Sequence, residues 1–377
     1  MNLFERIQIK FYREVLGSYR RYAFRKYQEF YEKQSKRSFE KVKDKKTLTP
    51  QQREEVLDFY RKLTGREVSL TDHAYFYSRT GVYSKEYMPK GLYQAEILGR
   101  ANRLDCYNSY ADKNLDEVLL PGVKHPRSIL KNINGYYYFE GRPVSKDEAV
   151  KLCQNLDEAI IKPSLALKGD GVRKISIKDG VTDVEGRSVE ALFDYYEKDF
   201  LIQEAVRQHE RMRMLNPTSV NTMRIMTYRS GMEVLLVYAV VRIGRMGQVI
   251  DNQSAGGISA KVNEDGTLGK YAFGVAGDDM IEKTDSGVVL DGYAIPSYER
   301  AVETVKKLHY NLPLFDLVGW DVAIDEGGEP VLIEWNGRPG PSQTACGTGF
   351  GDLTERIVKE VWPRKNTLIN SDSGIRQ

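Results

Sequence analysis

The chain has 377 residues, of which 41% are hydrophobic and 29% charged, which is ordinary for a globular protein of two or three domains. Its net charge of +3 gives no support for nucleic-acid binding, and no apolar run approaches the ~18 residues of a membrane span. Three widely spaced cysteines and four scattered histidines argue against a disulfide framework or a zinc site, and favour a reducing cytoplasm.

The N-terminal stretch, residues 1–46, is strongly basic, with 14 Lys and Arg against 6 Asp and Glu. Apolar residues recur in it at three- and four-residue steps, which predicts a long amphipathic helix over residues 3–45. The recurring residues are Phe4, Ile7, Phe11, Val15, Tyr19 and Tyr22. Such a helix can pack on the protein's own body and leave a solvated basic face, or it can contact an anionic membrane surface or an acidic polymer.

A second helix is predicted from Gln51 to Leu63, because Thr49-Pro50 is a start signal and Gly65 a stop signal. Residues 1–65 are therefore expected to form a basic helical region. Residues 66–110 are mixed in pattern and contain several tyrosines, and they indicate no particular chemistry.

From residue 111 the pattern changes to short strands and helices. Strands are predicted at Ser128–Asn132, Gly135–Phe139, Ala159–Pro163, Val172–Ile177 and Phe200–Val206, and helices at Ser145–Gln154 and Ser188–Lys198. Three further β-rich runs follow at Thr222–Tyr228, Glu233–Ile243 and Gln248–Val262. Helices are predicted at Ser297–His309 and Asp352–Val361, and the polar tail, residues 363–377, is expected to be disordered.

Lys162 leaves the strand that ends at Pro163, a position from which a lysine can reach a phosphate as a point charge. The loop that follows contains Lys168, Gly169 and Gly171, and its glycines would let backbone N–H groups close over phosphates. Because the loop joins two strands, it would act as a flap. The alternative is an ordinary β-hairpin with a flexible tip.

The strand at Phe200–Val206 ends in polar groups that could offer backbone and side-chain hydrogen bonds to a purine, although many strands end in this way. Arg224 lies in a strand whose alternate residues are apolar, so it must point to water or to an anion. Gly256 and Gly257 precede Lys261 and indicate either close approach of the backbone to a ligand or a simple bulge.

The most informative segment is a predicted hairpin near the C-terminus. Asp321 lies in the apolar run Val318–Ile324, and Glu334 and Asn336 lie on the returning strand. Side chains two apart on a strand share a face, so these two point the same way and the turn can bring Asp321 beside them. Two carboxylates and an amide suit Mg2+ completed by water and phosphate oxygens. Half-exposed strand residues are the alternative, but an unpaired carboxylate among apolar residues is costly.

These segments occur in the order found in ATP-grasp proteins. The spacing of Asp321, Glu334 and Asn336 resembles the metal motif of D-alanine–D-alanine ligases. More specifically, the chain resembles the sugar-transfer-associated ATP-grasp proteins, which are related to glutamate ligases, over roughly residues 90–360. The segments that carry this resemblance are Asn221–Arg224, Asp251-Asn252 with Gly256-Gly257, and Gly319–Asp321.

The resemblance implies an α+β ATP-grasp fold, in which two α/β subdomains grip ATP, preceded by a helical N-terminal region. The ATP-grasp domain would span residues 111–362. Its first part, residues 111–206, would carry the flap and hinge, and its second part, residues 207–362, the metal and catalytic half. Residues 66–110 would precede it.

The resemblance also implies roles for single residues. Two Mg2+ ions would be held by Asp321, Glu334 and Asn336. ATP would be bound by Lys113, Lys162, Lys168, Gly169, Gly171, Gln203, Glu204, Val206, His209, Glu210 and Asn221. Among these, the lysines would contact phosphates, the segment Gln203–Val206 would face the adenine, and His209 or Glu210 would lie near the ribose.

One departure concerns the catalytic arginine. D-Alanine–D-alanine ligases carry an arginine two places before the metal aspartate, where this chain has Gly319. Arg224 is therefore expected to supply the charge near the γ-phosphate. Lys261 and Arg338 are further catalytic candidates. Arg338 could hold an acceptor carboxylate as a bidentate fork, or be an ordinary surface arginine.

The reaction implied is an ATP-dependent ligation of a carboxylate to an amine through an acylphosphate. Its partners would be small acids and amines, with a sugar-linked acid of a surface polysaccharide as one candidate, and no nucleic acid. The alternatives are a kinase that uses the same ATP site on a hydroxyl, and a non-catalytic module that binds nucleotide or glycan. The expected location is cytoplasmic, at the inner face of the membrane if residues 1–46 contact it.

Overall fold

The computed structural model describes residues 3–165, 169–248, 251, 256–274 and 280–368, except for the side chains of residues 3–14, 16, 20 and 21. The chain divides into two compact units. Unit 1 comprises residues 1–106, 314–317 and 341–377, and unit 2 comprises residues 107–313 and 318–340. In the part described, no helix is both long and apolar enough to cross a membrane.

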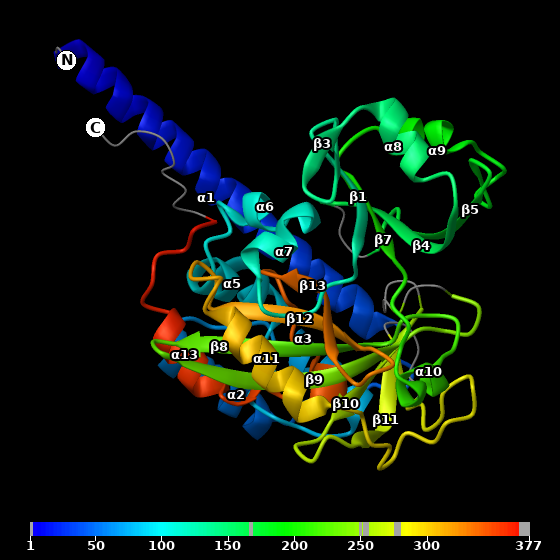
Figure 1. Ribbon diagram of the computed structural model, residues 1–377. Coiled ribbons are helices and arrows are strands. Elements are labelled where there is room, and N and C mark those ends of the chain that lie inside the picture. The colour runs from blue at the N-terminus through cyan, green and yellow to red at the C-terminus, as the bar shows by residue number, and fades with distance from the viewer. Residues whose placement is uncertain (1–2, 166–168, 249–250, 252–255, 275–279, 369–377) are drawn as a thin grey trace. The chain divides into compact units, whose positions relative to one another are not determined.

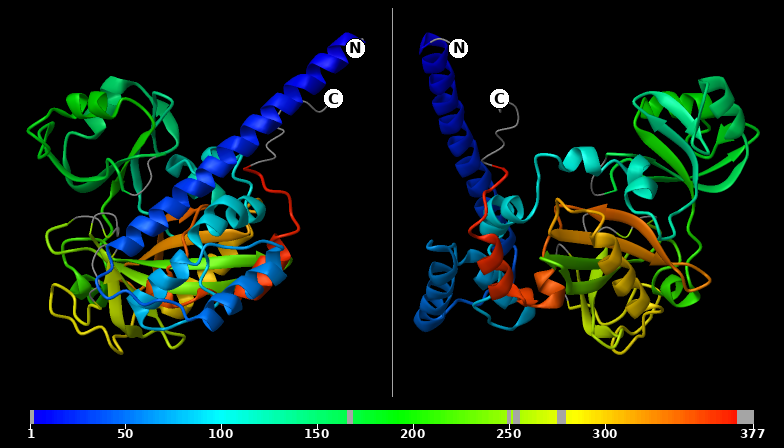
Figure 2. Two further views of the ribbon diagram at one scale, coloured as in Figure 1. Left: turned by 180° about the vertical axis from the view of Figure 1, so that it is seen from behind. Right: turned by 60° about the vertical axis from the view of Figure 1, so that its left-hand side comes forward.

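Unit 1 is mainly helical (Figure 1). Its elements are α1 (Leu3–Glu40), α2 (Pro50–Thr64), α3 (Thr71–Thr80), α4 (Lys90–Leu92), the π-helical turn η1 (Tyr93–Ile97), α5 (Leu98–Ala101), α12 (Gln343–Cys346), β14 (Gly349–Asp352) and α13 (Thr354–Val361). The predicted N-terminal helix is confirmed as α1, although it ends at Glu40 rather than at residue 45. Its N-terminal half projects away from the other helices of unit 1 (Figure 2).

The predicted start of α2 is confirmed in atomic detail. The Thr49 hydroxyl accepts from the Gln52 backbone N–H at 3.2 Å, and the Gln52 side chain accepts from the Thr49 N–H at 2.9 Å. Gly65 ends the helix with φ 68°, a left-handed conformation that glycine adopts without steric cost. Thr49, Pro50 and Gly65 therefore set both ends of this helix by local chemistry.

The last described residues, 363–368, do not match the expectation of a disordered tail. Asn366 is only 2% exposed, and its amide donates to the Ala95 carbonyl at 2.8 Å. The Thr367 hydroxyl contacts the carbonyls of Gly99 and Asn102, each at 2.9 Å. The expectation overlooked that these polar side chains satisfy backbone groups of η1 and α5. Residues 369–377 lie outside the described part.

The first sheet of unit 2 has seven strands in the order β3-β2-β1-β7-β4-β5-β6. The strands are β1 (Ser128–Ile133), β2 (Tyr136–Phe139), β3 (Arg142–Val144), β4 (Leu156–Pro163), β5 (Arg173–Lys178), β6 (Val181–Thr182) and β7 (Phe200–Glu204). Two helices, α8 (Lys146–Leu152) and α9 (Val189–Tyr196), supply apolar residues to its core. Because β4 and β5 pair antiparallel, the loop between them joins neighbouring strands, as predicted for the flap.

Three short elements precede this sheet: α6 (Tyr107–Tyr110), the 3-10 turn η2 (Lys113–Leu115) and α7 (Asp116–Leu119). The backbone N–H of Lys113 donates to the Ser164 carbonyl at 3.1 Å, just beyond the end of β4. This bond places the η2 turn beside the strand that carries Lys162.

The second sheet has six strands in the order β11-β10-β9-β8-β12-β13. They are β8 (Thr222–Ser230), β9 (Glu233–Ile243), β10 (Ile258–Val262), β11 (Leu268–Gly274), β12 (Leu317–Ile324) and β13 (Pro330–Asn336). Two helices accompany it, α10 (Glu210–Leu215) and α11 (Tyr298–His309), and α11 packs on β8 and β9. The run predicted at Gln248–Val262 is a strand only over β10 among its described residues, and β11 was not predicted.

A buried hydrogen-bond chain ties α11 to this sheet. The Thr227 hydroxyl on β8 accepts from the indole N–H of Trp320 at 2.8 Å and bonds Nδ1 of His309 at 2.8 Å. Trp320 is fully buried and immediately precedes Asp321. The strand that carries the candidate metal ligand is therefore anchored on its other face by packing and by a satisfied polar contact.

Candidate active site

The hairpin of β12 and β13 brings the predicted acidic residues together. Asp321 pairs directly with Glu334, and a register irregularity lies between Asp321 and Val322. Directly opposed residues of an antiparallel pair point to the same face. The two carboxylates therefore lie side by side on one face of the second sheet, as the sequence predicted.

Two arginines hold the carboxylate of Asp321. Arg224 on β8 donates through Nε to Oδ1 at 2.5 Å and through Nη2 to Oδ2 at 2.6 Å, and Arg242 on β9 donates to Oδ2 at 3.2 Å. Burial raises the pKa of Asp321, but the two guanidinium groups outweigh burial and hold that pKa below its usual value. Of the two predicted surroundings of Arg224, water or an anion, the structure shows an anion, the carboxylate of Asp321.

A second buried carboxylate extends this array. Asp251 accepts from the Thr222 hydroxyl at 2.5 Å and from the Thr222 backbone N–H at 2.9 Å. Burial raises the pKa of Asp251 to about 6, although Arg242 opposes the shift. Asp251, Arg242, Asp321 and Arg224 therefore alternate in charge, an arrangement that offsets the cost of burying each group.

Two lysines approach the same region, Lys113 from the η2 turn and Lys162 from β4. Lys113 lies 3.5 Å from Oε1 of Glu334, and its ammonium donates to the Ser164 carbonyl at 3.4 Å. Burial and the charge of Lys113 lower the pKa of Lys162. Burial also raises the pKa of Asp116, against the attraction of Lys162 and Lys113. Two ammonium groups therefore share a poorly solvated pocket, with Asp116 and Glu334 as the nearby negative charges.

Asn336 and Arg338 lie at the end of the hairpin. Oδ1 of Asn336 accepts from the Arg338 backbone N–H at 2.7 Å and from the Tyr107 hydroxyl at 3.4 Å. The Arg338 guanidinium carbon lies 5.8 Å from the centre of the Tyr107 ring. Burial raises the pKa of Tyr107 to about 12, so this hydroxyl remains a hydrogen-bond donor at neutral pH.

A cavity of about 140 Å³ is lined both by the two lysines and by the two carboxylates of the β12–β13 hairpin. Of the predicted site residues, its lining includes Lys113, Lys162, Gly169, Gln203, Glu204, Val206, Asp321 and Glu334. Apolar residues line it too, among them Ile160, Val172 and Ile333. An apolar pocket with basic groups and carboxylates at its edge suits a ligand that has a flat hydrophobic part and a polyanionic part.

Other predicted residues have structural partners. The side-chain amide of Asn221 donates to the carbonyls of Met212 and Asn216, each at 2.9 Å, and it is fully buried. Nδ1 of His209 accepts from the Arg211 N–H at the start of α10. Neither Asn221, His209 nor Glu210 lines the cavity. The hydrogen bonds of Asn221 stabilise the entry to β8, and its role in binding nucleotide stays a prediction.

Lys261 shares the sheet face of Arg224, since Arg224 pairs with Val240 and Val240 pairs with Lys261. It lies two strands away, about 10 Å across the sheet, and is exposed. Gly171 has φ 69°, and a Cβ there would lie 2.8 Å from Cγ of Pro163, so glycine is needed for close packing. Lys168 lies outside the described residues.

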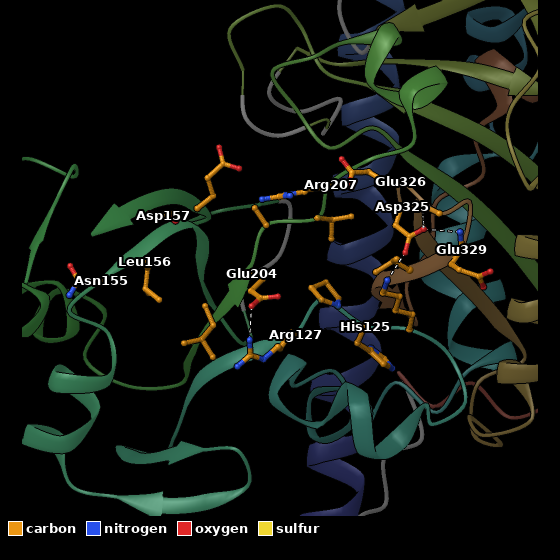
Figure 3. Close-up of a pocket in the computed structure, with 18 residues that line it drawn as sticks. His125, Arg127, Asn155, Leu156, Asp157, Glu204, Arg207, Asp325, Glu326 and Glu329 are labelled. Carbon is orange, nitrogen blue, oxygen red and sulfur yellow. Dashed lines mark hydrogen bonds and ion pairs between the residues drawn. The ribbon is translucent and has the colours of Figure 1, made fainter. Parts of the chain in front are cut away.

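A larger cavity, of about 860 Å³, lies beside the first one. Both are lined by Pro126, Glu204 and Val206, so they meet at the end of β7. Figure 3 shows that Glu204 turns towards Arg127, which it contacts at 2.8 Å. Asp325 accepts a hydrogen bond from Lys124. Two ion pairs, Glu204 with Arg127 and Asp325 with Lys124, lie among the charged groups of the larger cavity, and its lining does not include the lysines and arginines around Asp321. The smaller cavity is therefore the better candidate for an active site.

The oxygen atoms of Asp321, Glu334 and Asn336 are donors of the kind that Mg2+ prefers. Among the described residues, no three His, Cys, Asp or Glu side chains lie close enough to hold an ion on their own. The two carboxylates and the Asn336 amide are oxygen donors, and Mg2+ commonly uses one or two carboxylates with water and substrate phosphates. The residues therefore fit an ion that arrives with a nucleotide. In the free protein, Arg224, Arg242 and Lys113 balance the charge of the carboxylates.

The family model described as sugar-transfer associated ATP-grasp matches residues 94–359. The chain belongs to this family. The match contains β12, β13 and both sheets, so the predicted ATP-grasp fold is confirmed. No curated protein sequence matches the chain.

Solved structures similar to this ATP-grasp chain include the VanG D-Ala:D-Ser ligase from Enterococcus faecalis, with 16% identity over 67% of this chain and 60% of that one, and a TM-score of 0.39. The D-alanine–D-alanine ligase from Helicobacter pylori is 16% identical over 68% and 59%, with a TM-score of 0.39. The L-amino acid ligase from Bacillus licheniformis is 12% identical over 68% and 48%, with a TM-score of 0.36. The chain thus spans about half to three fifths of these proteins.

Several residues of the site were missed at the level of sequence. Arg242 carries the same signal as Arg224, an arginine in an apolar strand, but only the pairing of β8 with β9 reveals that both reach Asp321. Asp116 lies on a short helix, and Tyr107 precedes the predicted domain, so neither had a local signal. Asp251 lay in a recognised segment, but its hydrogen bonds to Thr222 join residues far apart in sequence.

Proposed function

We propose that this ATP-grasp protein is an ATP- and Mg2+-dependent ligase that joins a carboxylate to an amine through an acylphosphate. The observation that carries the proposal is the convergence at one cavity of Lys113, Lys162, Glu334 and the arginine-bound Asp321. Such a set neutralises a triphosphate and leaves no need for a side-chain nucleophile.

The chain's own groups would act mainly by position. Lys113 and Lys162 would bind phosphate oxygens, and Ile160, Val172 and Ile333 would cover the base. Asp321, Glu334 and Asn336 would hold Mg2+, which would supply charge neutralisation at the terminal phosphates. The cavity is smaller than the ~300–1,000 Å³ of typical ligand sites, so the proposal requires the β4–β5 hairpin or β7 to move when nucleotide enters.

The reaction then has two steps. A substrate carboxylate oxygen attacks the γ-phosphorus, the bond to the β–γ bridging oxygen breaks, and ADP leaves. The amine nitrogen next attacks the acyl carbon, loses a proton, and displaces inorganic phosphate. Arg224 and Arg242 would stabilise the charge on the transferring phosphoryl group, and exclusion of water would protect the acylphosphate from hydrolysis.

The substrate class and the location are further proposals. The family's association with sugar transfer supports an amino acid or amine joined to a sugar-linked acid in cell-surface polysaccharide synthesis. A cytoplasmic site of action follows from the supply of ATP, and contact of residues 1–46 with a membrane would place the enzyme at its inner face.

The decisive experiment incubates the protein with ATP, Mg2+ and a broad panel of acid–amine pairs, and measures ADP, phosphate and product mass. A ligase gives an amide with stoichiometric ADP and free phosphate. A phosphorylated product that persists would instead establish the kinase alternative. Tight ATP binding with no ADP formed under any condition would support the non-catalytic alternative.

Replacing Glu334 tests the same proposal at the level of the site. Glu334→Gln keeps the size of the side chain but removes a charge from the cavity, so turnover should fall by at least about 100-fold. Glu329→Gln is the matched control, because Glu329 lies in the turn of the same hairpin and pairs with Arg300. Full activity of Glu334→Gln would refute the assignment of this residue.

A further inference from the structure

One face of α1 combines exposed aromatic and basic side chains. Seven positions at successive three- and four-residue steps lie on it, and they are called here the α1 outer face: Val15, Tyr19, Tyr22, Lys26, Phe30, Lys33 and Arg37. All seven are exposed, with Tyr19 at 67%, Phe30 at 56% and Tyr22 at 54%. None of the seven is acidic.

The other side of α1 packs on unit 1. Ser35 is buried on this side of the helix, which packs on α3 and α4. A Cβ at Gly91, the middle residue of α4, would lie 3.3 Å from Cγ of Glu32 and 3.8 Å from Cγ of Gln28. The helix is therefore fixed on one side, and its outer face is a defined surface rather than a frayed segment.

The first of the two interpretations open from the sequence is confirmed in part, because α1 packs on α3 and α4, but through residues other than the described part of the predicted apolar stripe. Val15, Tyr19 and Tyr22, which belong to the predicted apolar stripe, do not pack on the protein's own body. The N-terminal half of the helix projects beyond the other helices of unit 1 in both views of Figure 2. Helices in water depend largely on packing of one face for their stability, so a surface that covers this face would stabilise α1.

The aromatic and basic side chains of the α1 outer face indicate which kind of surface it can bind. Tyrosine and phenylalanine favour the boundary between lipid headgroups and acyl chains, and Lys and Arg beside them attract anionic headgroups. Lys26 illustrates the combination, because its ammonium lies 5.7 Å from the centre of the Tyr22 ring while it pairs with Glu29 at 2.8 Å. Residues 1–46 add to the attraction with 14 basic against 6 acidic residues.

A second copy of the chain fits the same face poorly. A symmetric pair of α1 helices would place Lys26, Lys33 and Arg37 of both copies along one seam without an acidic residue of that face to pair with them. Like charges so placed are destabilising. We infer that the α1 outer face docks on an anionic membrane surface, with the aromatic residues inserted into the headgroup layer and the basic residues on the headgroups.

Sedimentation of the full chain with vesicles tests the inference. The vesicles are phosphatidylcholine alone, or phosphatidylcholine with phosphatidylserine. Wild-type protein should sediment with the anionic vesicles, bind neutral vesicles at least tenfold more weakly, and be released by salt. The triple variants Tyr19→Ser/Tyr22→Ser/Phe30→Ser and Lys26→Gln/Lys33→Gln/Arg37→Gln should each weaken binding to anionic vesicles at least tenfold.

A matched control separates the α1 outer face from overall charge. Lys62, Lys85 and Lys359 line a groove elsewhere in unit 1, and replacing all three with Gln changes the net charge by the same amount as the basic triple variant. The control should bind as wild type. Equal loss in the control, equal binding to neutral vesicles, or unchanged binding of both outer-face variants would overturn the inference. So would a stable dimer, seen by analytical ultracentrifugation, that both outer-face variants dissolve.

Discussion

At the scale of single residues, the site is organised around one carboxylate and two guanidinium groups. Arg224 and Asp321 are both less than 7% exposed and share two short hydrogen bonds. Breaking a buried ion pair from one side leaves a charge without its partner, which costs more than the pair itself contributes. Arg224 therefore has a stability role in the free protein besides any role in catalysis.

Substitution of Arg224 should expose this stability role. Arg224→Met leaves Asp321 with only Arg242, and should lower the free energy of unfolding by about 3–5 kcal/mol. The double variant Arg224→Met/Asp321→Leu removes both charges and should recover part of that loss. Urea unfolding followed by tryptophan fluorescence measures both, because Trp320 precedes Asp321 and pairs with Trp335 on the neighbouring strand. Wild-type stability of the single variant would contradict the prediction.

Asp116 should control how the charge on Lys162 responds to pH. Burial disfavours both charged groups, and Asp116 supports the protonated form of Lys162. In Asp116→Asn the pKa of Lys162 should fall further, so the ammonium is lost at lower pH. The ratio of the ADP dissociation constants of variant and wild type should therefore rise between about pH 6 and 9.

Calorimetric titration with ADP measures this ratio without any knowledge of the substrates. Glu117→Gln serves as the control, since Glu117 is the next residue but pairs with Lys131 and Ser128. Its ratio should be flat with pH. A flat ratio in Asp116→Asn as well would mean that Asp116 has only a structural role.

At the scale of elements, the hairpin of β12 and β13 and the ends of α2 were predictable because their signals are local. Alternating apolar residues, a turn at Asp325–Glu329 and the Thr49-Pro50 start each act within a few residues. The elements between Leu70 and Tyr110, and the strand β11, were not predicted. Apart from α3, the elements between Leu70 and Tyr110 are only three to five residues long. Arg242 was also missed, because its partner Asp321 is on another strand.

The cap of α2 gives a test of such a local signal. Thr49→Ala removes the hydroxyl that accepts from the Gln52 N–H, and should destabilise unit 1 by about 1 kcal/mol. Thr49→Ser retains the oxygen and should be close to wild type. Thermal unfolding followed by circular dichroism compares the three proteins, and equal melting of Thr49→Ala and wild type would show that tertiary packing alone holds this end.

At the scale of the whole molecule, a buried neutral histidine links folding to pH. His73 is fully buried between the rings of Tyr60 and Tyr87, and Nε2 lies 3.2 Å from the Lys85 carbonyl. Burial lowers the pKa of His73 from 6.5 to about 4. The unfolded chain therefore binds a proton that the folded chain does not, over the interval between those two values.

The sign of the effect follows from this difference. The contribution of His73 to the free energy of unfolding is complete above pH 6.5. It declines as the pH falls towards 4, by up to about 3 kcal/mol. His73→Gln lacks the titrating group, so its stability should depend less on pH over this interval. Urea unfolding of both proteins at several pH values gives the comparison, and parallel curves would exclude His73 as the source.

The register irregularity after Asp321 has a consequence for how relatives of this chain are aligned. The two acids meet because the irregularity places Glu334, rather than Ile333, opposite Asp321, so residues added or lost within Asp325–Glu329 would leave their meeting point unchanged. One residue lost between Asp321 and that turn would swing the carboxylate to the opposite side of the ribbon. An alignment of relatives should therefore allow insertions and deletions in the turn and forbid them within β12 and β13. The pairing of the two acids, and not the number of residues between them, is what the fold preserves.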